Sequence, residues 1–245
     1  MNARNDPVFQ WKNICLVPIL HNRVEFAMEV RRRFERFRPD AVAVEFPDTL
    51  KTGILRAVDR LPLLSVVFYE EADGAFVYLP VEPTDGQVEA LRLARSAGIP
   101  VHFIDRDTEG YLPDPAPMPD PYAVRRIGHH AYCRAYLRFG GRGGPRPQDT
   151  LREKTMAHRL QRLSRSSERV LFVGGLAHLP GLLAHLDRPQ TEVIGRRRRE
   201  GVGLAHLHRE SSREIMTEMP FLAAAYERAR SDDGPVDVDR LKVNR

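Results

Sequence analysis

Short apolar segments rich in β-branched residues alternate along the chain with longer segments of helical periodicity. Strands are expected at residues 14–20, 41–46, 64–69, 75–79, 100–104, 170–173 and 191–194. Helical spacing marks residues 22–37, 85–97, 122–138 and 149–163. Several of the strands are apolar throughout, which is typical of parallel strands buried on both faces. The pattern predicts an α/β fold with a mainly parallel central sheet flanked by helices.

One segment departs from this alternation. In VVFYEEADGAFVYL, Asp73-Gly74 lies between two β-rich runs, which predicts an antiparallel hairpin at one edge of the sheet. Residues 139–148 hold four glycines and two prolines and are expected to form a flexible loop. Because the strand pattern resumes afterwards, we expect a single domain over residues 1–245, with its core at 12–210. The remainder, 211–245, reads as a helical segment that continues into a longer protein.

The composition is that of an ordinary globular protein, with 42% hydrophobic and 29% charged residues and a net charge of +5. Part of the basic excess lies in two clusters, Arg31–Arg33 on a helix face and Arg196–Arg199 after a glycine. The second cluster lacks interleaved aromatic residues, so a surface loop is expected rather than a nucleic-acid contact. Two cysteines, Cys15 and Cys133, are too few for a disulfide framework or a cysteine-rich zinc module.

The first residues, MNARNDPVFQWKN, lack the apolar stretch of a signal peptide. No run approaches the roughly 20 apolar residues that a membrane helix needs. We therefore expect a cytoplasmic protein without a membrane partner.

Chemistry-bearing residues follow the predicted strands at the edge where parallel strands end, which is where ligands bind in α/β sheets. This edge is expected to gather His21, Glu45, Asp105, Arg106, Gly174, Gly175 and His178. A buried carboxylate in an apolar strand needs a partner, and the two histidines are the obvious candidates for Glu45. The three side chains would suit either acid–base catalysis or a divalent metal such as zinc or manganese.

Each of these residues also has a structural interpretation. A histidine after a strand is more often a hydrogen-bonded structural residue than a ligand, and this applies to His206 and His208 as well. Arg152, near the start of a helix, could balance Glu45 or bind an anionic group. A solvent-exposed pair of Arg152 with Glu153 is an equal alternative.

The ordered set PILHNRVEFAMEVRRRFERFRPDAVAVEFPDTL, IDRD, REKTMAHRL and VLFVGGLAHLPGLL resembles the TraB/TIKI/ChaN/erythromycin-esterase superfamily. The resemblance covers most of residues 14–186. It maps His21 and His178 onto two G-x-x-H histidines, Glu45 onto an acidic residue and Arg152 onto a helix arginine. The first motif departs from the pattern, because Pro18 replaces its glycine.

The resemblance implies hydrolase chemistry, since TIKI members look like metal-dependent peptidases and erythromycin esterases use a histidine base. Binding of haem, as in ChaN-like members, fits less well because those proteins are exported, whereas no export signal is recognised in this sequence.

The leading hypothesis is a hydrolase of ester or amide bonds in a small molecule or peptide, with His21, Glu45, Arg152 and His178 as catalytic residues. In it, Asp105, Arg106, Gly174 and Gly175 bind the substrate, and His21, Glu45 and His178 could hold a metal. The alternative is a non-catalytic module that binds a ligand, haem or a metal within a larger bacterial defence or regulatory assembly.

Overall fold

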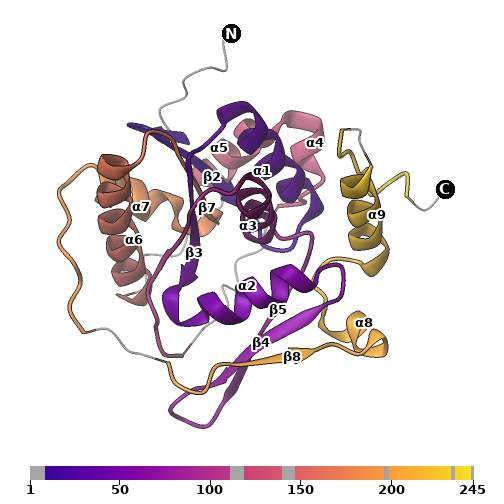
Figure 1. The fold of residues 1–245 in the computed structure, drawn as a ribbon. Helices are drawn as coiled ribbons and strands as arrows, with labels where there is room; N and C mark the ends of the chain where they lie inside the picture. The colour runs from indigo at the N-terminus through magenta and orange to yellow at the C-terminus, as the bar shows by residue number, and fades with distance from the viewer. Residues whose placement is uncertain (1–8, 111–118, 140–146, 196–198, 233–234, 244–245) are drawn as a thin grey trace.

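The computed structural model describes residues 9–110, 119–139, 147–195, 199–232 and 235–243, and these form an α/β structure (Figure 1). The strands are β1 Gln10–Trp11, β2 Ile14–Ile19, β3 Ala41–Pro47, β4 Ser65–Glu70, β5 Phe76–Val81, β6 Val101–Asp105, β7 Val170–Gly175 and β8 Gly203–His206. The α-helices are α1 Val24–Phe37, α2 Lys51–Arg60, α3 Gly86–Ala97, α4 Ala123–Ile127, α5 His129–Phe139, α6 Pro147–Ser166, α7 Leu179–Leu186, α8 Ser212–Ile215 and α9 Pro220–Ser231. Short 3-10 helices are η2 Asp48–Leu50, η3 Leu176–His178 and η4 Arg209–Ser211.

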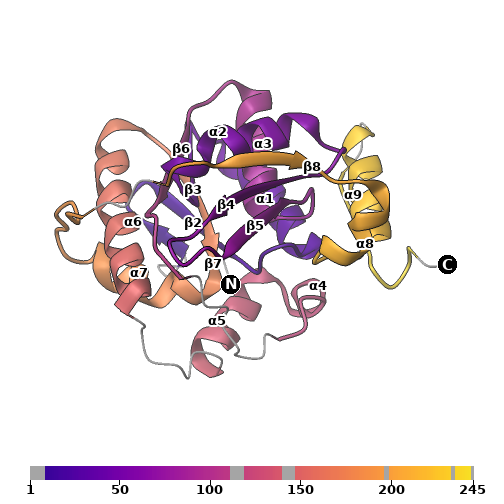
Figure 2. The same ribbon diagram turned by 90° about the horizontal axis from the view of Figure 1, so that it is seen from below.

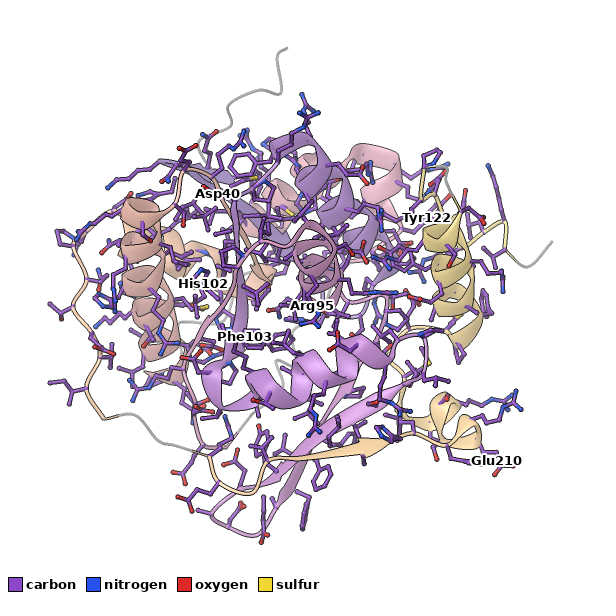
Figure 3. All side chains as sticks on the ribbon, in the orientation of Figure 1. Asp40, Arg95, His102, Phe103, Tyr122 and Glu210 are labelled. Carbon is purple, nitrogen blue, oxygen red and sulfur yellow. The ribbon has the colours of Figure 1, made fainter. Side chains whose placement is uncertain are left out.

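The central sheet has the strand order β1-β2-β7-β3-β6. Strands β2, β7, β3 and β6 are parallel, and only β1 pairs in the antiparallel sense. The mainly parallel sheet is therefore confirmed. The register pairs Ile19 with Gly175, so β2 and β7 end side by side. Asp40, which precedes β3, marks the opposite, amino end of the sheet (Figure 3).

The predicted hairpin forms from β4 and β5, with Gly74 in the left-handed region at φ 83°. It does not extend the central sheet. Instead it joins β8 in a separate three-stranded antiparallel sheet of order β5-β4-β8. Helix α2 lies between this sheet and the rest of the molecule, and a Cβ on its Gly53 would lie 3.2 Å from Val67 in β4 (Figures 1 and 2).

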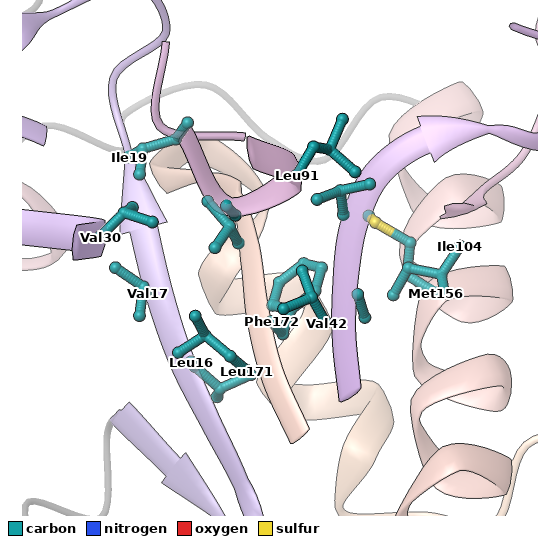
Figure 4. Packing of buried hydrophobic residues seen from close by; sticks show 14 of the residues in the cluster. Leu16, Val17, Ile19, Val30, Val42, Leu91, Ile104, Met156, Leu171 and Phe172 are labelled. Carbon is teal, nitrogen blue, oxygen red and sulfur yellow. The ribbon is translucent and has the colours of Figure 1, made fainter. Parts of the chain in front are cut away.

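A continuous apolar core surrounds the central sheet (Figure 4). Its strands contribute fully buried residues such as Ile14, Val42 and Leu171, which explains their unbroken apolar sequences. Helices α1 and α3 pack against each other, and α6 packs against β6 and α7. Both cysteines are buried and free. No helix among the described residues has the length and apolarity required to cross a bilayer.

Three local expectations are wrong. Residues 191–194 form no strand, because the segment has no buried face, and Ile194 is 93% exposed. The expected helix 122–138 is two helices separated by Gly128, whose φ of 82° ends α4. In the segment 211–245, α8 and α9 form, but the described residues 235–243 make no helix. Most of the glycine-rich loop (140–146) and Arg196–Arg198 fall in undescribed parts of the chain.

Candidate functional site

The two histidines from distant parts of the chain meet at one glycine. A Cβ placed on Gly175 would lie 3.3 Å from His21 Nε2, 3.3 Å from Glu45 Oε2 and 3.7 Å from His178 Cδ2. The register of β2 with β7 causes this, because it brings the turn after Ile19 beside the end of β7. The absent side chain leaves the space in which the three groups approach each other.

Glu45 is the buried carboxylate at the centre of this group, with a side chain only 4% exposed. Its Oε2 accepts a hydrogen bond from Gly175 N at 2.5 Å, and its Oε1 accepts one from Arg152 Nη2 at 2.6 Å. Burial raises the pKa of Glu45, but His178, Arg152, His21 and the Gly175 amide together lower it below its ordinary value. The carboxylate therefore stays ionised in a site where an unpaired one would be costly.

Arg152 binds two carboxylates from neighbouring strands. Its Nε and Nη2 donate to Asp105 at 2.9 Å and 2.6 Å, beside the bond to Glu45. Burial lowers the pKa of Arg152, whereas Asp105 and Glu45 raise it by more, so the guanidinium keeps its charge. The expectation that Arg152 balances Glu45 is confirmed, and the exposed pairing with Glu153 does not occur.

His178 is held at both ring nitrogens. Arg152 Nη1 lies 3.0 Å from Nε2 and can only donate, so the neutral imidazole carries its proton on Nδ1. That proton is donated to Glu153 Oε1 at 3.2 Å. Burial lowers the pKa of His178, but Glu45 and Glu153 outweigh it and raise the pKa above the ordinary value.

His21 is oriented by a carboxylate from another part of the chain. Its Nδ1 lies 3.2 Å from Asp85 Oδ2, so Nδ1–H is donated to Asp85 while Nε2 faces Gly175. Asp85 is buried, and its other oxygen caps α3 by accepting from the amides of Gln87 and Val88. Partial desolvation by the surrounding protein atoms lowers the pKa of His21, while Asp85 and Glu45 raise it by more, above its ordinary value.

The side chains of this cluster differ in how much of their surface is exposed to solvent. The side chain of His21 is 49% exposed, whereas those of Arg152 and His178 are 16% and 14% exposed. Asp85, Asp105 and Glu153 are buried. His21 is therefore the member of the cluster that a substrate can reach, and the other members form the charged layer behind it.

Other predicted site residues lie elsewhere or act through the backbone. Arg106 Nη2 donates to Gly195 O at 2.6 Å, and the backbone amide of Arg106 donates to Asp105 Oδ1 at 2.7 Å. A cleft of about 420 Å³ is lined by Arg106 and reaches the cluster through Asp105. His206 lies 3.2 Å from Ser65 Oγ in the second sheet, and the exposed His208 lies 3.7 Å from Glu210. Figure 3 shows Glu210 far from the central sheet.

Two residues of the site were not expected from the sequence. In the sequence, Asp85 is the first residue of a predicted helix. It follows a strand of the hairpin, whereas the site residues were sought at the ends of the parallel strands. Glu153 reads as a surface residue, yet it is 6% exposed and contacts His178. One signal pointed to Glu153, because helical spacing places it on the same side of α6 as the buried Met156.

The donor set does not fit a metal in this arrangement. Both Glu45 oxygens and both His178 nitrogens already have protein partners, and the Arg152 guanidinium stands where a cation would have to lie. The described part of the chain holds no group of three or more His, Cys, Asp or Glu side chains arranged to bind a metal ion. These contacts give no support to the zinc or manganese expected at His21, Glu45 and His178, and no catalytic step below depends on a metal.

Comparison with family models, curated proteins and solved structures yields no match to this chain. The TraB-like resemblance therefore depends on the quoted motifs alone.

Proposed function

We propose that the chain is a hydrolase of ester or amide bonds in which His21 acts as general base. One observation carries this proposal: the half-exposed His21 is fixed by Asp85 at Nδ1, which leaves Nε2 free to take a proton at the Gly175 edge. A carboxylate behind a histidine is the arrangement that orients an imidazole base and stabilises its charged form. The order of the TraB-like motifs supports the same reaction class.

In the proposed reaction, His21 Nε2 removes a proton from a water molecule as the water oxygen attacks the carbonyl carbon of the substrate. The C–O or C–N bond of the tetrahedral intermediate then breaks. The leaving group takes the proton back from Nε2, which restores neutral His21. Asp85 and Glu45 stabilise the imidazolium between these steps, and the same two carboxylates raise the pKa of His21 above its ordinary value.

Arg152 and His178 support this reaction indirectly. Arg152 is bound to Glu45 and Asp105, so its role in the proposal is to hold Glu45 ionised beside His21 rather than to bind substrate. His178 has both nitrogens engaged and completes the charged layer. The proposal therefore assigns proton transfer to one histidine instead of two.

The non-catalytic binding module has one observation in its favour. Most polar atoms of the cluster are satisfied within the protein, as in a structural ion-pair network. In that case His21 would contact a bound ligand without turning it over.

Hydrolysis of a broad panel of esters and peptides separates these two functions. We expect turnover by the wild type, loss of at least about 100-fold in kcat/KM for His21→Ala, and no change for His208→Ala. His208 is a suitable control because it is an exposed histidine of the second sheet region. Equal turnover by His21→Ala and the wild type would overturn the proposal, and binding without turnover would favour the module.

A further inference from the structure

The turn that carries His21 depends on a left-handed residue. Asn22 has φ 54°, a conformation that asparagine adopts more readily than most residues with a side chain. Its amide donates to Asp85 Oδ2 at 3.0 Å, the same oxygen that accepts from His21 Nδ1. The geometry of the His21–Asp85 contact therefore depends on the conformation of Asn22.

The helix that follows this turn is capped from a distant part of the chain. Arg23, the N-cap residue of α1, makes no capping hydrogen bond with its own side chain. Instead Glu218 Oε2, 194 positions away in sequence, accepts from the amide of Val24 at 3.3 Å. An acidic group at this point also interacts favourably with the helix dipole.

Thr217 holds the turn directly. Its Oγ1 accepts a hydrogen bond from Asn22 Nδ2 at 3.2 Å, and its carbonyl accepts one from Arg23 Nη1 at 3.1 Å. Thr217 and Glu218 thus contact each of the three residues that follow His21.

Thr217 and Glu218 are themselves anchored on the segment that contains Asp85. The buried Glu82, three residues before Asp85, accepts from the amides of Thr217 and Glu218 at 2.8 Å and 3.3 Å. Arg240 Nη2 donates to Glu218 at 2.8 Å and also to Glu25 in the first turn of α1. The connection between α8 and α9 is therefore fixed relative to both partners of the His21 contact.

We propose that Thr217 and Glu218 are positioning residues that hold the His21 turn so that Nδ1 meets Asp85 and Nε2 faces Gly175. The proposal deepens the proposed function and rests on it for its catalytic meaning. Charged groups face His21 from three elements: Asp85 before α3, Glu45 in β3 and His178 in η3. A relaxed turn would weaken the His21–Asp85 hydrogen bond together with that of the Asn22 amide, because both have Asp85 Oδ2 as their acceptor.

The test is the tautomer of His21 in the full chain, read by NMR of protein labelled with nitrogen-15 histidine under alkaline conditions. His21→Asn assigns the signal. In the wild type we expect the Nδ1–H form that donation to Asp85 selects. Thr217→Val removes the hydroxyl from an exposed residue, and Glu218→Ala removes the cap while leaving Arg240 bound to Glu25. Both variants are expected to shift His21 toward the Nε2–H form of free imidazole.

Thr217→Ser keeps the hydroxyl and is the matched control, expected to retain the wild-type tautomer. Hydrogen exchange at the Asn22 and Val24 amides is expected to be roughly tenfold faster in Glu218→Ala. An unchanged tautomer and unchanged exchange in folded Thr217→Val and Glu218→Ala would overturn the proposal.

This readout needs no turnover, so it separates the inference from the proposed function. Tautomer shifts in a protein without hydrolytic activity would leave the positioning role intact and reject the hydrolase. Activity that depends on His21, together with a tautomer insensitive to both variants, would support the hydrolase and reject the positioning role.

Discussion

At the scale of single residues, the site depends on contacts that leave little space. His21, Glu45 and His178 meet at Gly175, and the Glu153 carboxylate that holds His178 lies directly against Gly181 in α7. A Cβ on Gly181 would lie 1.9 Å from Glu153 Oε2. These two glycines are thus structural requirements of the charged layer behind His21.

Gly181→Ala is expected to displace the Glu153 carboxylate and leave Nδ1–H of His178 without its acceptor. The free energy of unfolding should fall by about 1–3 kcal/mol, measured by urea denaturation. The double variant Glu153→Ala with Gly181→Ala supplies the control, because alanine at 181 costs less once the carboxylate is absent. Additive losses in this cycle would show that the two side chains do not compete for the same space.

The raised pKa of His21 gives a pH-dependent contribution to stability. Protonation is favoured in the folded state, so this contribution is full below the ordinary value of 6.5 and is lost as pH rises through the higher folded-state pKa. The difference in unfolding free energy between the wild type and His21→Ala should therefore be larger at mildly acidic than at alkaline pH. A difference that grows with pH would contradict this sign.

At the scale of elements, α6 is tied to the ends of two parallel strands by one side chain. Arg152 joins Glu45 of β3 and Asp105 at the end of β6, and both carboxylates are buried. Removing one partner from a buried ion pair costs more than the pair contributes, because the remaining charges are left uncompensated.

Arg152→Met should therefore lower the free energy of unfolding by about 3–5 kcal/mol, measured by chemical denaturation at neutral pH. Arg95→Met is the matched control, since Arg95 and Asp59 form a pair with side chains 46% and 48% exposed, and should cost less than about 1 kcal/mol. Equal losses in the two variants would mean that Glu45 and Asp105 gain other partners when Arg152 is removed.

The elements also show what the sequence could predict. The parallel strands were predictable because they are buried on both faces and therefore apolar throughout, and His21, Glu45 and His178 follow from where those strands end. Asp85 was not predictable, because its place beside His21 depends on how α3 returns to the sheet. Residues 191–194 include the β-branched Thr191, Val193 and Ile194, but tertiary pairing decides whether such a segment becomes a strand.

At the scale of the whole molecule, the C-terminal part of the described chain packs against helix α1, near the N-terminus. Helix α9 and Val238 pack on α1 in a second apolar cluster around Leu222 and Tyr226. Arg240 pairs with the buried Glu25 of α1 at 2.6 Å. Among the described residues, the region around α9 therefore has no apolar core independent of α1.

We accordingly expect one cooperative unfolding transition for the chain. The fluorescence of Trp11, the single tryptophan, reports the central sheet, while far-ultraviolet circular dichroism reports all helices, including α9. The two denaturation curves should coincide. A loss of helical signal that precedes the Trp11 transition would contradict the single domain.

The central claim is that Asp85 orients His21 as the base of a hydrolase, and the pH dependence of kcat/KM tests it most directly. Asp85→Asn keeps an oxygen to cap α3 but removes the charge beside His21. We predict that kcat/KM falls by at least about 100-fold and that the acidic limb of the profile moves to lower pH, because the pKa of His21 falls. An acidic limb and a kcat/KM that remain those of the wild type would contradict the account.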